Sequence, residues 1–460
     1  MRLLNLCLCS VFGLMLSAGA NAESLEQELR GLLKDHPQLS ASMALVRAAK
    51  QGEGIAAAGF YPTVTITGDG GYEHTDSVAT RLRGKDLSTS RYSNTLSLTW
   101  NVFNGYLSTA QRESARLDTR IAEQSERRTM QALILESAST YLDVLRQNDL
   151  RRLAVSNENT IMSQLELEDE RVKRGSGVAV DVLLAKSRLQ VSKERRTKIE
   201  TALADAHSRY SQIFGHPALV AGMTSPTLPV AMLPGSLADA VVSIDKDNPA
   251  ILTSRRRIDR ASQIRRGAKA GYYPKLDIVA RQNWEDDVDG VAGDRRDYAF
   301  LGRVTWEIFS GFATRSRLSK AAEDYSAAVQ NARHILRKSR EELELAWHQY
   351  TSTGERRGLL ANAVVIAAEV FEARKTLREV GSETILNVLD AENELLNACI
   401  NLVNADFENR VSVYRVLFAM GRLEADTVLN ASSGGDSGAS ESLSEISPES
   451  ARACRFSATG

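Results

Sequence analysis

The side chains that could carry out chemistry are spread thinly along this chain of 460 residues. A zinc protease needs the spacing HExxH, and a serine hydrolase of the common α/β type needs GxSxG. Neither spacing occurs, and the six histidines form no close pair. The stretch GDGG at 68–71 lacks the Lys-Ser/Thr pair of a phosphate-binding loop, and glycine within a strand explains it better. The sequence therefore predicts a protein that is not an enzyme, with no catalytic residues, no cofactor and no metal site.

Composition and the N-terminal segment indicate a protein of the cell envelope. The net charge of -1 gives no sign of a nucleic-acid partner. Residues 1–22 combine Arg2, an apolar run and small residues before the expected cleavage point, which is typical of a secretory signal peptide; a membrane anchor would need a longer run. Cys399 and Cys454 remain after cleavage, too few for a disulfide framework, so we expect a protein that does not depend on disulfides. No other segment has 18 consecutive apolar residues, so any contact with a membrane core must use strands.

An internal repeat organises the chain. SLTWNVFNG at 97–105 returns as RVTWEIFSG at 303–311, an offset of 206 residues. The same offset relates the glycine turns near 175 and 381, and an offset of 212 relates GFYP at 59–62 to GYYP at 271–274. A register held over this span predicts a tandem duplication of about 180 residues per unit.

Most of each repeat has the composition of very long helices. The stretches 63–216 and 275–447 contain no proline, which would break a helix or a central strand. Residues 106–174 also lack glycine and are rich in helix formers, so we expect a helix on the order of 100 Å long. Gly175 and Gly177 should end it, and Gly381 marks the equivalent turn, because glycine takes the positive φ that closes a helix. A second helix should then return alongside the first.

The helix after the second turn has the pattern of a coiled coil. Large and small residues alternate at heptad spacing through Val388, Ala391, Leu395, Ala398, Leu402 and Ala405. The outgoing helix of the second repeat contains Gly354 and Gly358, so we expect it to be broken near its middle.

Two hairpins, 62–104 and 274–310, precede the long helices. Apolar and polar residues alternate in PTVTITGD, SNTLSLTWNVF and FLGRVTWEIF, which predicts β-strands. An ordinary half-buried sheet would explain the alternation. The secretion signal, strand lengths of about ten residues and charged connecting loops favour a transmembrane barrel. Four strands cannot close a barrel, and an open edge in lipid leaves backbone groups unpaired, so several chains must contribute.

The repeated tryptophan motif has a predicted place in this scheme. Trp100 and Trp306 should lie near the strand ends, where indole favours the membrane interface, although a packing role is the alternative. Phe103 and Phe309 should mark the points where strand gives way to helix. The predicted domains are a signal peptide (1–22), a first repeat (23–215), a linker (216–247), a second repeat (248–427) and a disordered Ser/Gly-rich tail (428–460).

The sequence resembles the TolC-like outer-membrane efflux proteins from about residue 27 to residue 423. The resemblance rests on the duplicated Asn/His-Pro starts, the two aromatic-Tyr-Pro strand entrances, the two W-x-φ-F-x-G exits, and VGSETILNVLDAENEL running into YRVLFAMGRL. It implies a mostly α-helical homotrimer in the outer membrane of a Gram-negative bacterium. Four strands per chain would form a 12-stranded barrel in the lipid, and the helical hairpins would form a tunnel across the periplasm. It also implies a periplasmic adaptor and an inner-membrane ABC or RND transporter as partners.

The resemblance further implies that the glycine turns lie at the periplasmic end of the tunnel. Asp181 and Asp390 match family aspartates near these turns, where three copies of each would favour cations and constrict a pore. Asn387 stands where many members have another Asp, and Arg378 and Glu383 stand where the best-known member has a Tyr and an Arg of its gate. Solvated charges at the helix ends are the alternative.

Three functions remain open from the sequence. A passive exit duct for type I protein secretion is favoured, because ERVKRGSGVAVDVLLAKSRLQ and RYSQIFGHP look most like members that export large adhesins. The outer-membrane component of a small-molecule efflux pump is the alternative within the same class. A periplasmic coiled-coil scaffold without a pore is the alternative from another class.

Overall fold

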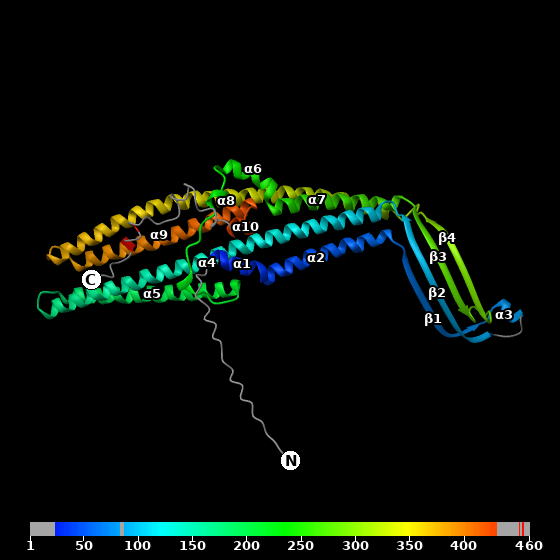
Figure 1. Cartoon of the computed structure of the whole chain (residues 1–460), viewed down its shortest axis with the longest axis horizontal. Coiled ribbons are helices and arrows are strands. Elements are labelled where there is room, and N and C mark those ends of the chain that lie inside the picture. Colours follow the sequence, from blue (N-terminus) through cyan, green and yellow to red (C-terminus); the bar gives the residue numbers. More distant parts are fainter. Residues whose placement is uncertain (1–23, 83–86, 430–449, 451–452, 455–460) are drawn as a thin grey trace, which may run out of the picture.

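The structure is a computed structural model that describes residues 24–82, 87–429, 450 and 453–454. The segment predicted as a signal peptide, 1–22, lies outside the described residues. The described chain forms a long bundle of helices with a four-stranded sheet at one end (Figure 1).

Four long helices confirm the predicted repeat. Helix α4 (Leu107–Lys173) and helix α8 (Ala313–Glu379) both have 67 residues, and α5 (Ala179–Phe214) and α9 (Ile385–Met420) both have 36. The two pairs begin 206 residues apart, as the sequence motifs predict. At about 1.5 Å per residue, α4 and α8 are each on the order of 100 Å long.

Shorter helices precede each hairpin and explain the duplicated prolines. Helices α1 (Leu25–Asp35) and α2 (Pro37–Ala57) lead to the first hairpin, and α6 (Leu237–Asp247) and α7 (Pro249–Ala268) lead to the second. Each proline occupies the first helical position, where its missing N–H costs no hydrogen bond. The side chains of His36 and Asn248 cap these helices by accepting backbone N–H groups. The remaining short helices are η1 (Ala58–Phe60), α3 (Val78–Leu82), η2 (Val220–Gly222), η3 (Val230–Met232), η4 (Lys269–Tyr272) and α10 (Ala425–Leu429).

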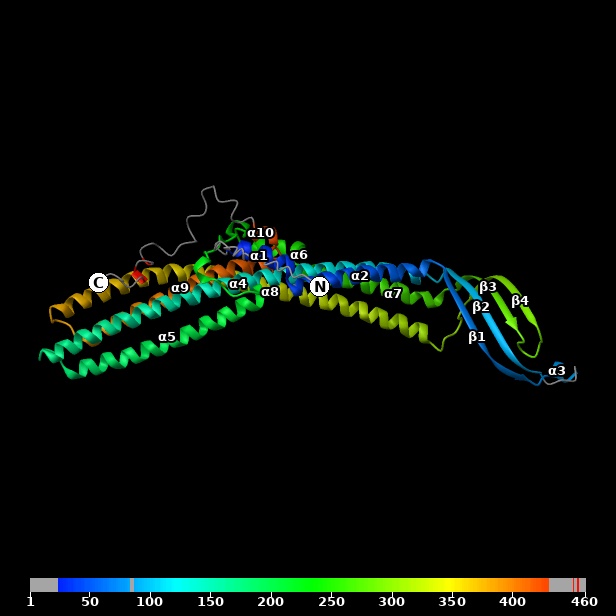
Figure 2. The same cartoon turned by 60° about the horizontal axis from the view of Figure 1, so that its bottom comes forward.

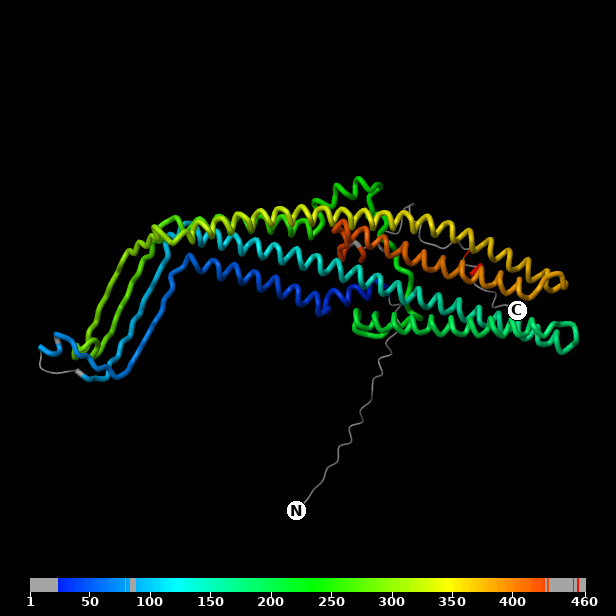
Figure 3. The backbone as a smooth tube through the Cα atoms, turned by 180° about the vertical axis from the view of Figure 1, so that it is seen from behind, coloured from blue at the N-terminus to red at the C-terminus, as the bar shows by residue number. Residues whose placement is uncertain are grey.

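The long helices are supported differently along their length. Near the sheet, α4 packs against α2 and α7, and toward the other end it packs against α5 and α9 (Figure 3). Helix α8 packs against α7 and then α9. Shorter helices therefore cover each 67-residue helix one after another along its length. This is how a helix too long for a compact domain remains packed.

The sheet joins the two repeats edge to edge. Strands β1 (Thr63–Thr75), β2 (Leu87–Phe103), β3 (Lys275–Asp286) and β4 (Asp294–Thr305) pair antiparallel in that order. Figure 2 shows the sheet leaving the bundle at an angle from the ends of α2, α4 and α7. The central pair, β2 with β3, brings the first hairpin against the second.

The second hairpin is shorter than the predicted 274–310. Strand β4 ends at Thr305, so Trp306 and Phe309 follow the strand, whereas Trp100 and Phe103 lie within β2. The physical reason is the partner strand. Thr305 is paired with Lys275, the first residue of β3, and the residue before it, Pro274, has no N–H to continue the ladder.

The W-x-φ-F-x-G motif makes the turn from sheet to helix in both repeats. Gly105 and Gly311 have positive φ (67° and 60°), and so do the residues that follow, Tyr106 and Phe312 (67° each). A Cβ on Gly105 would lie 2.9 Å from the backbone of Ala270, so a larger residue does not fit there. Two successive residues with left-handed backbone conformation turn the chain sharply. Both sheet-to-helix turns need this conformation, which explains why the motif occurs in both repeats.

The predicted coiled coil is confirmed, and the predicted break in α8 is wrong. Five of the six heptad residues of α9 are buried, and four of these five belong to a core cluster shared with α4, α5 and α8. Helix α8 continues through Gly354 and Gly358. Since α9 packs along α8, tertiary contacts outweigh the roughly 1 kcal/mol that each glycine costs a helix.

The C-terminal segment departs from the sequence expectation. Cys399, wholly buried in α9, forms a disulfide with Cys454. Nothing in the sequence indicates this pairing, because it places Cys454 beside the middle of α9, 55 residues away along the chain. Whether the protein depends on the disulfide stays a prediction. The predicted tail also begins too early, since Val428 lies in α10 and is buried in the core around Tyr141. Most of the predicted tail, 430–449, lies outside the described residues.

Candidate entrance at the helix tips

The α4–α5 and α8–α9 turns lie together at the end of the bundle opposite the sheet (Figure 1). Gly175 and Gly381 have φ of 79° and 78°, the left-handed conformation predicted for them. Gly177 serves differently, because a Cβ there would lie 2.8 Å from the backbone nitrogen of Val172. The turns also close alike: the backbone N–H of Ser176 donates to Arg171, and that of Ser382 donates to Leu377.

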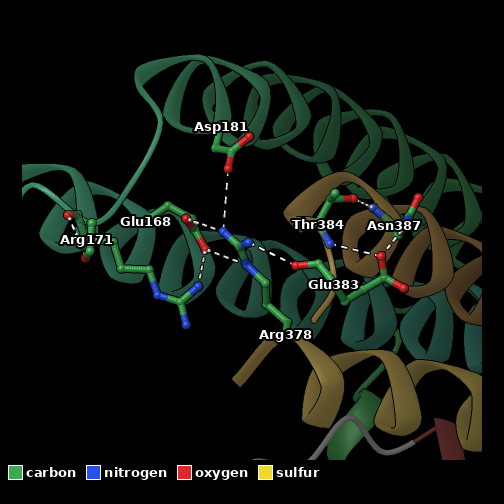
Figure 4. A network of polar contacts seen from close by, with 8 residues as sticks. Glu168, Arg171, Asp181, Arg378, Glu383, Thr384 and Asn387 are labelled. Atoms are coloured by element: carbon green, nitrogen blue, oxygen red, sulfur yellow. Dashed lines mark hydrogen bonds and ion pairs between the residues drawn. The ribbon is translucent and has the colours of Figure 1, made fainter. Parts of the chain in front are cut away.

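Arg378 ties the two hairpins together just behind the turns. Its guanidinium lies on Glu168 of α4, with Nη2 to Oε2 at 2.8 Å and Nε to Oε1 at 3.3 Å (Figure 4). The same group reaches Asp181 of α5 at 3.5 Å and donates to the Glu383 carbonyl at 3.0 Å. Arg171 pairs with Glu168 as well, at 3.1 Å. The Glu168 side chain is only 3% exposed, so this pair of arginines neutralises a buried carboxylate.

Asp390 belongs to a second, more exposed contact between the hairpins. Its Oδ1 lies 2.7 Å from Nη2 of Arg188 on α5, and about half of its side chain is exposed. Asp181 and Asp390 therefore approach different arginines. In the described chain each predicted entrance carboxylate is an ion-pair partner, and neither is an isolated charge.

Asn387 organises the start of α9. Thr384 caps the helix by accepting the backbone N–H of Asn387, and Asn387 Nδ2 donates to the Glu383 carboxylate. The hydrogen bonds that Glu383 accepts from Asn387 Nδ2 and from the Thr384 backbone N–H lower its pKa. The Asn387 carbonyl accepts from Arg374 at 3.3 Å. Its side chain is thus a local donor, in the place where the resemblance leads one to expect a carboxylate.

Sequence reasoning missed three members of these contacts: Glu168, Arg171 and Arg188. The spacing of Glu168 and Arg171, three residues apart on one helix, is a weak signal of an ion pair. The contact of Glu168 with Arg378 spans 210 residues and depends on the relative register of two hairpins. Nothing in a single sequence specifies that register.

The aromatic residues predicted at strand ends lie at the other end of the bundle. Trp100 is partly exposed and its Nε1 donates to the carbonyl of Phe60 at 3.0 Å. Phe103 and Phe309 each make an edge-on ring contact with the aromatic residue at the start of the following helix, at 5.4 and 5.5 Å. Trp306 and Phe309 are more than half exposed.

The two faces of the sheet differ in character. On one face lie Val64 and Ile66 of β1 with Phe300 and Val304 of β4, all at least 63% exposed. On the other face, polar side chains bond across the strands: Thr65 to Ser97, Thr95 to Asn283 and Asn101 to Asp277. The alternation of apolar and polar residues predicted from the sequence is therefore present in the sheet. The described helices do not cover the apolar face of the sheet.

The described residues contain no group of three or more His, Cys, Asp or Glu side chains arranged to hold a metal ion. None of the helices in the described ranges is both long enough and apolar enough to cross a membrane.

Comparison with known proteins gives one consistent picture. The family model described as "Outer membrane efflux protein" matches residues 29–216 and 241–422, one segment per repeat. The chain is 25% identical to the outer membrane efflux protein BepC of Brucella suis over 417 residues, covering 88% of this chain and 87% of BepC. It is 23% identical to the outer membrane protein TolC of Vibrio cholerae over 439 residues, covering 94% and 98%. The crystal structure of VceC, an outer membrane protein of Vibrio cholerae, superposes with a TM-score of 0.75 at 18% identity and covers 86% of this chain and 96% of that one.

Proposed function

The chain belongs to the outer membrane efflux protein family, and we propose that three copies of it form the passive exit duct of a tripartite export system. It is a transport protein of the outer membrane that extends into the periplasm, and it is not an enzyme. In the proposed trimer, twelve strands close a barrel in the lipid and the helical hairpins enclose the tunnel.

The uncovered apolar face of the sheet is the observation that carries this proposal. Exposed side chains such as Ile66 (72%) and Phe300 (77%) would be an aggregation hazard in water, but they suit a lipid environment. Strands β1 and β4 have no partner on their outer edges among the described residues. Lipid offers no hydrogen bonds to such edges, so β4 of one copy must pair with β1 of the next.

We place the entrance of the duct at the helix tips. The tips lie at the far end of α4 and α8 from the sheet, about 100 Å away along the helices. A trimer axis parallel to the helices would gather three copies of Asp181 and Asp390 around it. Their ion pairs with Arg378 and Arg188 would then hold the hairpins in a constricted arrangement.

The proposed partners follow from the role of a passive duct. A passive duct does not itself supply energy, so an inner-membrane transporter of the ABC or RND class would drive export. A periplasmic adaptor would join that transporter to the helix tips. The strand-end aromatics Trp100, Phe103, Trp306 and Phe309 would lie at the lipid interface, which suits their partial exposure.

For the cargo we propose a large protein exported by a type I system. The support is the resemblance of the α4–α5 tip segment, residues 170–190, and of 209–217 to members that serve such export. Small-molecule efflux is the second candidate, favoured by the names of relatives such as the pyoverdine export protein OpmQ of Pseudomonas aeruginosa, 22% identical over 412 residues.

Two experiments test these proposals separately. Envelope fractionation on a sucrose gradient tests the duct: recovery in the soluble periplasmic fraction would support the pore-free scaffold instead. Deletion of the gene, with surface adhesin and drug sensitivity assayed in parallel, tests the cargo. Loss of surface adhesin with unchanged drug sensitivity supports type I secretion, and the reverse result supports efflux.

A further inference from the structure

Glu392 is a buried carboxyl group at the contact between the two helical hairpins. It lies on α9, where its residue is only 1% exposed, and it faces α4. It lies seven positions after the first residue of α9, which places it about 10 Å behind the tip. The adjoining core cluster consists of apolar residues of α4, α5, α8 and α9, and two of its members, Ile161 and Leu389, line a small cavity with Glu392.

The hydrogen bonds around Glu392 are incomplete. Asn157 Nδ2 donates to Glu392 Oε1 at 2.8 Å, and Ser192 Oγ donates to Asn157 Oδ1 at 3.3 Å. Glu392 Oε2 and Gln164 Oε1 are both buried acceptors that find no donor among the described residues. One proton on Glu392 would change a surplus acceptor into a donor within this polar group.

Among the described residues, no Lys, Arg or His side chain forms an ion pair with the Glu392 carboxylate. Arg188 and Arg195 of α5 line a cavity of about 30 Å³ beside it. Arg188 pairs with Asp390 at 2.7 Å, and Arg195 donates to Asn393 at 3.4 Å. Burial therefore raises the pKa of Glu392 to about 8, partly opposed by the hydrogen bond from Asn157 and by the nearby Gln164 side chain.

We propose that Glu392 is a proton-operated latch between the two hairpins of each chain. With its proton, the carboxyl group is neutral and lets α9 pack closely on α4. When the proton passes to water, a buried carboxylate with one short hydrogen bond remains, and α9 must separate from α4 to hydrate it. The proposal rests on the duct proposed above, because the latch lies directly behind its entrance.

The latch predicts a pore whose opening depends on pH through a named residue. In planar bilayers, native trimers should conduct several-fold more at pH 9 than at pH 6.5, with a midpoint near 8. Glu392→Gln, which is neutral at every pH, should keep the low-pH conductance throughout. Glu394→Gln is the matched control, because Glu394 has the same charge on the same helix but is exposed. Asn157→Ala should move the native midpoint to higher pH, because it removes a hydrogen bond that favours the carboxylate.

Infrared spectra of the full-length protein give a second readout that requires no pore. The native protein at pH 6.5 should show a protonated-carboxyl band that Glu392→Gln removes and Glu394→Gln retains.

Absence of that band, or the same pH response in native and Glu392→Gln pores, would overturn the latch and leave a water-bridged carboxylate. If no variant conducts at any pH, the duct itself fails, and the infrared result still decides whether Glu392 holds the proton. If Glu392→Gln does not assemble, Asn157→Ala tests the latch instead. A conductance midpoint moved to higher pH supports the latch, and an unchanged midpoint contradicts it.

Discussion

Charged residues at the helix tips form ion pairs, so the effect of removing one of them on stability depends on how deeply its partner is buried. Arg378 has two carboxylate partners, one of them buried, whereas Lys375 one turn earlier on α8 has an exposed partner, Glu372, at 3.7 Å. Exposed pairs contribute little to stability, while loss of one partner of a buried pair leaves an uncompensated charge.

Arg378→Ala should therefore destabilise the contact between the hairpins by about 2–3 kcal/mol. This is less than the full cost of breaking a buried ion pair, because Arg171 still compensates the Glu168 carboxylate. We expect faster hydrogen exchange at the ends of α4 and α8 and a larger conductance in planar bilayers. Lys375→Ala should change stability by less than about 0.5 kcal/mol. Equal exchange rates in the two variants would show that the Arg378 contacts do not hold the hairpins.

Asp390→Ala should alter ion selectivity without unfolding the chain. Its pair with Arg188 is about half exposed, so stability should change by about 0.5 kcal/mol or less. Removal of three carboxylates leaves three unpaired Arg188 side chains near the proposed axis, so cation preference and block by multivalent cations should both weaken. Glu372→Ala serves as the control farther from the turn. Unchanged selectivity in the Asp390 variant would favour simple solvated charges.

Glu392 should also make stability depend on pH. Its folded pKa of about 8 lies above the value of 4.5 expected in the unfolded chain, so the folded state holds a proton that the unfolded state has lost in that range. Stability should thus fall as pH rises from about 4.5 to 8, by up to roughly 4–5 kcal/mol, and level off above. Thermal unfolding at pH 5.5 and 8.5 checks this, since Glu392→Gln should lose less than the native protein. Parallel losses in both proteins would assign the slope to other groups.

At the scale of elements, the sequence predicted what depends on local pattern. The four long helices, the glycine turns and the period of the strands follow from propensity, from proline and glycine positions, and from the repeat offset, so they appear where expected. Three features depend on partners distant in sequence and were missed or misjudged: the continuity of α8 through Gly354, the end of β4 opposite Lys275, and the Arg378 contact with Glu168.

The disulfide is a fourth such feature, because Cys454 lies at the end of a Ser/Gly-rich segment that gives no hint of its partner. It closes a loop of 55 residues back onto α9. Loop-closure entropy alone gives a stabilisation of about 4 kcal/mol as an upper figure. Cys454→Ser should therefore lower the midpoint of thermal unfolding, and reducing agent should lower the native midpoint to the same value while leaving the variant unchanged. A native midpoint that does not respond to reducing agent would show that this loop contributes nothing to global stability.

At the scale of the whole molecule, the decisive question is what covers the apolar face of the sheet. In the proposed trimer lipid covers it, while in a periplasmic scaffold it would face water or another protein. Phe300 lies near the middle of β4 on the apolar face, opposite Ala280, and the neighbouring residue Ala299 lies on the polar face, opposite Arg281. The two positions have the same depth in the sheet and opposite faces, so lysine substitutions at each form a matched pair.

In a lipid-embedded barrel, Phe300→Lys should cost about 2–4 kcal/mol per chain, because a lysine near the middle of the hydrocarbon layer is desolvated. Three copies per trimer should reduce the amount of assembled protein in the outer-membrane fraction strongly. Ala299→Lys faces the water-filled interior, where repulsion from Arg281 costs at most about 1 kcal/mol, so it should assemble and shift the pore toward anions. A soluble sheet predicts the opposite order, since lysine at an exposed apolar position would improve solubility. Normal outer-membrane recovery of Phe300→Lys would therefore remove the main support for the duct, and its loss beside a recovered Ala299→Lys would identify lipid as what the apolar face contacts.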